Sequence, residues 1–162
     1  MNVKAISGKV VFIKTLNGVG MIIKSILLSL CGSVFLFGAE SVAFVKSVKG
    51  DATLQRENKT HLIQSGEKLY PHDVIATSEK STVGISFQDG TRVALGAKSH
   101  LKIDEFLFDP SKKNFRFDLS LDKGSAVFES GKIGKLAPEK VSFKVPQGIV
   151  GIRGTKFLVE VE

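Results

Sequence analysis

The three histidines, His61, His72 and His100, are the first candidates for chemistry in this chain. A histidine ring can act as a general base or as a metal ligand. None of the three belongs to a spaced ligand pattern of the kind that zinc sites use. His72 adjoins Asp73, but adjacent residues of a strand face opposite sides. We therefore expect no metal site and no bound cofactor.

Acids and hydroxyls are the second group that could react. Asp104 and Glu105 are neighbours, whereas a glycosidase needs two carboxylates that converge on one bond. On a strand the two side chains should diverge, so we expect exposed acids at a strand end. Ser125 and Ser130 lack the Gly-x-Ser-x-Gly context of an activated serine and have no histidine nearby in sequence. The sequence predicts no catalytic residue and no enzyme.

The most distinctive segment is glycine-rich and lies near the C-terminus, at 146–155. Its three glycines and Arg153 could suggest a phosphate-binding loop, but no Lys-Ser/Thr pair and no helical pattern follows. The glycines are better explained by backbone that needs positive φ or a close approach, with Arg153 bonded to carbonyls or an acid. These glycines are Gly148, Gly151 and Gly154.

Strands must position all of these residues, because alternation dominates the chain from residue 40 onward. In the clearest unit, 82–95, Val83, Ile85 and Phe87 share one face, and Asp89–Gly90 is typical of a tight hairpin turn. Alternation also marks 115–121, after which Lys123–Gly124 is expected to turn the chain. No segment has the periodicity of a convincing helix. Ten or so short strands predict an all-β domain at 40–162.

The region before residue 40 has the pattern of a targeting segment. Lys24 precedes a 14-residue apolar run from Ile26 to Ala39, and small and polar residues follow it. We predict a signal peptide at 21–39, cut after Ala39 or Ser41. A membrane anchor formed by 22–39 is the alternative. Residues 1–20 are either a start-site extension upstream of Met21 or a long charged leader.

Charge and cysteine content narrow the partners. The net charge is +7, but four lysines lie before residue 40, where there is no acid. The remainder, 40–162, carries only +3 with mixed signs, which does not favour a nucleic-acid partner. The single cysteine, Cys31, lies inside the apolar run, so a cleaved protein would contain no thiol and no disulfide.

Three stretches together resemble the FecR domain family. They are TVGISFQDGTRVALGAKSHLKIDEF at 82–106, LSLDKGSAVFESGKI at 119–133 and VSFKVPQGIVGIRGTKFLVEV at 141–161. The similarity spans roughly Val45 to Val161. It implies a single FecR-like β domain of short antiparallel or solenoid-like strands, with a β-sandwich as the alternative.

The resemblance also implies a role. FecR proteins are periplasmic regulators of iron-siderophore uptake, and the family has no catalytic residues to transfer. Too few residues precede the apolar run for the cytoplasmic domain of regulatory FecR proteins. We expect a stand-alone exported module that binds another envelope protein or relays a signal. The alternatives are a secreted or surface module that binds glycan or a matrix protein, and inner-membrane anchoring in place of a periplasmic location.

Overall fold

The computed structural model describes residues 40–152 and 156–162, so the predicted signal peptide, Arg153 and Gly154 lie outside the described residues. Strands account for most of the described chain, as predicted. In chain order they are β1 (Ala43–Lys49), β2 (Ala52–Arg56), β3 (Lys59–Leu62), β4 (Lys68–Leu69), β5 (Val74–Thr77), β6 (Thr82–Phe87), β7 (Arg92–Leu95), β8 (His100–Asp109), β9 (Asn114–Glu129), β10 (Val141–Val145), β11 (Gly148–Gly151) and β12 (Lys156–Val161).

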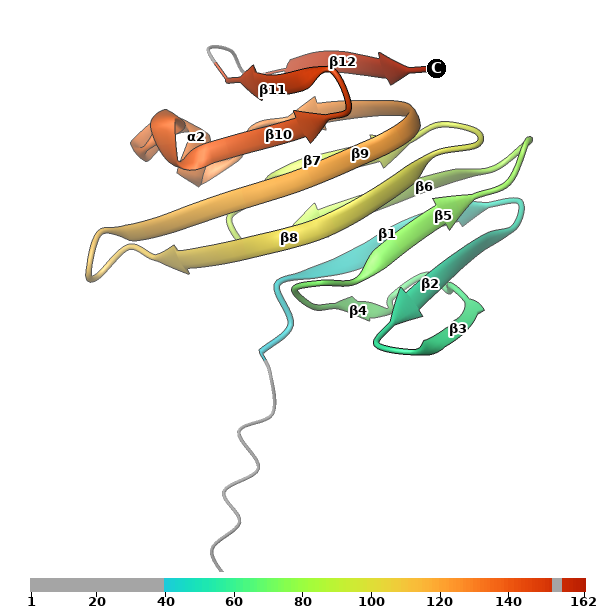
Figure 1. Cartoon of the computed structure of the whole chain (residues 1–162). Helices are drawn as coiled ribbons and strands as arrows, with labels where there is room; N and C mark the ends of the chain where they lie inside the picture. The colour runs from blue at the N-terminus through green and yellow to red at the C-terminus, as the bar shows by residue number, and fades with distance from the viewer. Residues whose placement is uncertain (1–39, 153–155) are drawn as a thin grey trace, which may run out of the picture. The chain divides into compact units, whose positions relative to one another are not determined.

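The strands form one curled sheet, in the order β3-β2-β5-β8-β9-β7-β6-β1-β4 (Figure 1). β10 and β12 also pair with β9, and β11 pairs with β10. Every pair is antiparallel except β9 with β10. The sheet is thus curled and largely antiparallel, and β9 is its central strand.

β9 runs through the point where the sequence predicted a turn. Its first part pairs with β8 and its last part pairs with β7 and β12, so one strand belongs to both halves of the sheet. Gly124 has a φ of 83° at the change of partner. A Cβ atom there would lie 2.4 Å from the Cα of Ser99. The Lys123–Gly124 prediction was therefore wrong: the glycine bends the strand instead of reversing it.

Phenylalanines fill the space between the two halves of the curled sheet. Phe87 on β6 lies 4.7 Å from Phe117 on β9, measured between ring centroids, and 5.5 Å from Phe106 on β8. The series continues through Phe128 to Phe143, with Phe128 at 5.8 Å from Phe117. All five are buried. Tilted and edge-on aromatic pairs of this kind add to the stabilisation from burial, so these five phenylalanines are a central part of the core.

Two short helical segments occur, although the sequence showed no convincing helical periodicity. They are α2 (Lys132–Leu136) and a 3-10 turn, η1 (Pro138–Lys140). They carry the chain from the end of β9 to β10, which runs parallel to β9. A parallel pair needs such a crossover connection. Within the described residues no helix is long and apolar enough to cross a membrane.

Candidate functional site

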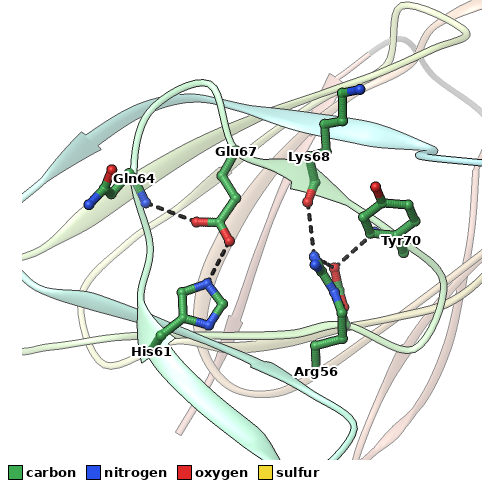
Figure 2. A network of polar contacts seen from close by, with 7 residues as sticks. Arg56, His61, Gln64, Glu67, Lys68 and Tyr70 are labelled. Carbon is green, nitrogen blue, oxygen red and sulfur yellow. Dashed lines mark hydrogen bonds and ion pairs between the residues drawn. The ribbon is translucent and has the colours of Figure 1, made fainter.

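A network of polar contacts surrounds Arg56 at the end of β2 (Figure 2). Its Nε and Nη2 atoms each donate a hydrogen bond of 2.8 Å to the carboxylate of Asp73, which is fully buried. Nη2 also donates to the carbonyl of Lys68 at 2.9 Å, and the guanidinium lies 4.5 Å from the centroid of the Tyr70 ring. The backbone N–H of Tyr70 donates to Asp73 as well.

This cluster is a structural clip. The hydrogen bond from Arg56 to Asp73 raises the pKa of the guanidinium above its ordinary value. Both carboxylate oxygens already accept hydrogen bonds. A buried carboxylate needs such partners, because an unpaired one is strongly destabilising. The clip joins β2 to β4 and to the turn that leads into β5.

The three histidines lie in three different elements of the fold. His61 on β3 lies 2.6 Å from Glu67, which also accepts a hydrogen bond from the N–H of Gln64 (Figure 2). His100 on β8 lies 2.9 Å from Asp122. His72 lies in a turn with a φ of 72°. Over the described ranges no three His, Cys, Asp or Glu side chains come together as metal ligands do.

The acid pair lies inside β8 and not at its end, which corrects the prediction. Ile103 pairs with Leu119 and Glu105 pairs with Asp118, so Asp104 is the extra residue of a β-bulge. The bulge explains why Ile103 and Phe106 are both buried although three positions separate them.

Positively charged side chains form ion pairs with both acids on the outer face of β8. Asp104 lies 3.1 Å from Lys102 and 3.6 Å from Lys144, and Glu105 lies 3.4 Å from Arg116. Burial raises the pKa of the Asp104 carboxyl, but the hydrogen bonds from Ser120 and Lys102 and the nearby lysine charges outweigh it. The resulting pKa is below its ordinary value. A carboxyl that ionises so readily is a poor general acid.

A buried serine that the sequence reasoning missed organises the bend of β9. The Ser99 hydroxyl accepts a hydrogen bond of 2.9 Å from the N–H of Ser125 and faces the carbonyl oxygens of Gly96 and Ser125. Thr77 donates to the same Gly96 carbonyl and accepts from the N–H of Ser99. Ser125, which the sequence analysis set aside as a nucleophile, thus contributes its backbone here. The position of Ser125 next to Gly124 was the only feature of the sequence that pointed to this bend.

Asp89 is the second residue whose role the sequence did not reveal. It lies in a four-residue connection between β6 and β7, and only Gly90 has positive φ there, at 87°. The predicted hairpin between β6 and β7 is confirmed, but Asp89 is not among the residues with positive φ. The buried carboxylate accepts hydrogen bonds from the N–H and hydroxyl of Thr91 and, at 3.2 Å, from the N–H of Ile133. Asp89 fastens the start of α2 to the β6–β7 connection.

The glycine-rich segment forms β11 and the start of its connection to β12. Gly148 has positive φ, at 154°, as the sequence suggested. A Cβ atom at Gly148 or Gly151 would meet nothing within 4 Å, so no close approach explains either glycine. Within the described residues β11 pairs with β10 alone, which makes it an edge strand there. Its Ile149 side chain is 69% exposed.

In the part of the chain that the structure describes, three strands longer than two residues lie at sheet edges: β3, β11 and β12. An edge strand has backbone N–H and C=O groups that can pair with another chain. Each of the three also exposes a large apolar side chain, namely Leu62, Ile149 and Leu158. A hollow of about 450 Å³ beside β11 is lined by one charged residue, Glu139, among Pro138, Val141, Gly151 and Ile152. The arrangement favours contact with an extended chain.

The described residues thus form a curled, largely antiparallel β domain with several edge strands. The chain belongs to the FecR family, whose model, described as FecR protein, matches residues 73–162, more than half of the sequence. That range is shorter than the 45–161 similarity read from the sequence, but it contains all three quoted motifs. Neither the curated proteins nor the solved structures include a match. The family is generally involved in iron-siderophore transmembrane signalling, and its domains are typically periplasmic.

Proposed function

We propose that this chain is an exported FecR module that binds another envelope protein through strand addition and so takes part in signal relay. In strand addition, an extended segment of the partner pairs its backbone with an exposed sheet edge. The observation that carries the proposal is the edge strand β11. Family membership supports the signalling context and the periplasmic location.

β11 is the least protected of the edges. Natural proteins protect edge strands with charged residues, with proline or by keeping them very short. β4 has two residues, and β3 includes Lys59 and His61. β11 reads Gly-Ile-Val-Gly and has no charged side chain. Ile149 is the most exposed large apolar residue among the described ones, so β11 offers both backbone pairing and apolar contact.

A glycan-binding role has weaker support. Sugar recognition commonly uses the faces of aromatic rings. The chain has one tyrosine and no tryptophan. The Arg56 guanidinium lies over the ring of that tyrosine, Tyr70, so its face is already engaged within the fold.

The test is a pull-down from the envelope fraction with the protein expressed from its full chain. Ile149→Lys adds a charge to the β11 edge and should reduce partner recovery at least tenfold. Leu62→Lys is the matched control, because Leu62 on edge strand β3 has a similar exposure of 63%, and it should leave recovery unchanged. No partner above background, or equal loss with both variants, would overturn the proposal.

A further inference from the structure

The edge strand β12 has a pattern that complements itself. Lys156, Leu158 and Glu160 are all exposed on one face of the strand, and Phe157 and Val159 are half-buried on the other. Leu158 is 65% exposed. Among residues 40–152 and 156–162, β12 pairs with β9 alone, and its other side has no strand partner there (Figure 1).

From this pattern we infer that two copies of this chain dimerise by antiparallel pairing of β12 with β12, centred on Leu158. Two identical strands that pair antiparallel around a central residue place positions at equal distances on either side opposite each other. Leu158 then faces Leu158 of the second copy, and Lys156 faces Glu160 in both directions. The two apolar side chains and both charge pairs are matched at once.

Which side chains lie opposite each other depends on the register of the β12–β12 pair. Directly opposite residues on one face of an antiparallel pair interact, and opposite charges there are stabilising whereas like charges are destabilising. Centring the pair on Val159 instead would place Leu158 opposite Glu160. Because the two copies are related by twofold symmetry, this contact of an apolar side chain with a charge would occur twice. The sequence of β12 therefore favours the register centred on Leu158.

The charged groups of β12 are available for these contacts. Neither Lys156 nor Glu160 forms an ion pair within residues 40–152 and 156–162. Glu129 is the cross-strand neighbour of Lys156 on β9, but its carboxylate lies 3.6 Å from Arg92. Ser125 is the neighbour of Glu160. Pairing would also cover Phe157 and Val159 on the inner face.

The contact is small, since β12 has six residues. Stable protein interfaces usually bury at least ~1,200 Å² in total, and smaller ones are transient. We therefore expect a dimer that dissociates in the micromolar range. The inference does not depend on the proposed function, which concerns β11 and a different partner.

Charge reversal provides the test, with sedimentation equilibrium of protein purified from cells that express the full chain. Glu160→Lys and Lys156→Glu should each raise the dimer dissociation constant about tenfold, because each places like charges opposite each other in both pairs. The double variant Lys156→Glu/Glu160→Lys restores both pairs with reversed signs and should bring the constant back to within about threefold of the original.

Glu160→Lys is the cleaner single variant, since its neighbour within the protomer is a serine, whereas Lys156→Glu also approaches Glu129. Circular dichroism checks that each variant keeps its strands. Ile149→Lys on β11 is the matched control and should leave the constant unchanged. A protein that stays monomeric at all concentrations would overturn the inference. So would a dimer that is insensitive to the single variants, or one that the double variant fails to restore.

Discussion

Gly124 allows one strand to serve both halves of the sheet. Its positive φ of 83° disfavours any residue with a Cβ atom, and Ser99 occupies the space where that atom would lie. Ser99 in turn bonds through its hydroxyl to Ser125, directly after the bend, and to the carbonyl of Gly96 at the end of β7. Glycine and serine therefore act together at the point where β9 changes partners.

This arrangement predicts that Gly124→Ala destabilises the protein by at least ~3 kcal/mol, the sum of the left-handed backbone penalty and overpacking. Gly66→Ala is the matched control, because Gly66 has a similar φ of 87° and a Cβ atom added there would meet nothing within 4 Å. Its cost should be only ~1–2 kcal/mol. Urea denaturation measures both. Equal losses for the two variants would show that Ser99 does not crowd the bend.

Asp104 predicts a pH dependence of stability. Its pKa is lowered in the folded protein, so its contribution is complete above the unfolded pKa of ~3.9 and is lost as pH falls through the folded value. Asp104→Asn lacks this contribution. The difference in unfolding free energy between the original protein and the variant should be constant above about pH 5 and should shrink below about pH 4. A difference that stays the same at pH 3 would contradict the assignment. Urea denaturation across pH 3–7 is the measurement.

At the scale of elements, the crossover from β9 to β10 depends on a contact that is distant in sequence. The side-chain carboxylate of Asp89 accepts a hydrogen bond from the N–H of Ile133. The backbone carbonyl of Asp89 accepts a second one, of 2.9 Å, from the N–H of Lys132. A Cβ atom at Gly131 would lie 2.3 Å from the N atom of Thr91. The β6–β7 connection thus holds the segment that delivers β10 to its parallel position.

We therefore predict that Asp89→Ala costs ~2 kcal/mol, because buried N–H groups lose their acceptor. Faster hydrogen exchange should follow, confined mainly to residues 131–145, and mass spectrometry measures it. Asp109→Ala, at the end of β8 beside the β8–β9 turn, is the control and should leave exchange in 131–145 unchanged. Uniform acceleration across all strands after Asp89→Ala would argue against a local role for Asp89.

At the scale of the whole molecule, the predicted signal peptide and the β domain can be tested separately. We expect N-terminal sequencing of the protein from a periplasmic fraction to begin at Glu40, since the apolar run ends at Ala39. Recovery in the membrane fraction with residues 22–39 intact would instead identify an anchor. Circular dichroism of the purified protein should be dominated by strand signal, as the twelve strands require.

The amino-acid sequence by itself determined the all-β class, the strand segments and the family. Those features depend on local alternation and turn residues, which need no knowledge of distant neighbours. The predicted unit at 82–95, for example, corresponds to β6 and β7 with their connection. The three separated motifs around Asp89, Gly124 and Gly148 were sufficient to indicate the FecR family.

Only the tertiary structure decided which residues hold the domain together and which edges stay open. Asp73, Asp89 and Ser99 look like ordinary turn or surface residues in sequence, yet each is buried against a partner 17, 44 or 26 positions away. Whether Gly124 reverses a strand or bends it depends on Ser99, which pairing places beside it. An edge strand likewise has no local sequence signature, because its neighbours are set by the order of the whole sheet.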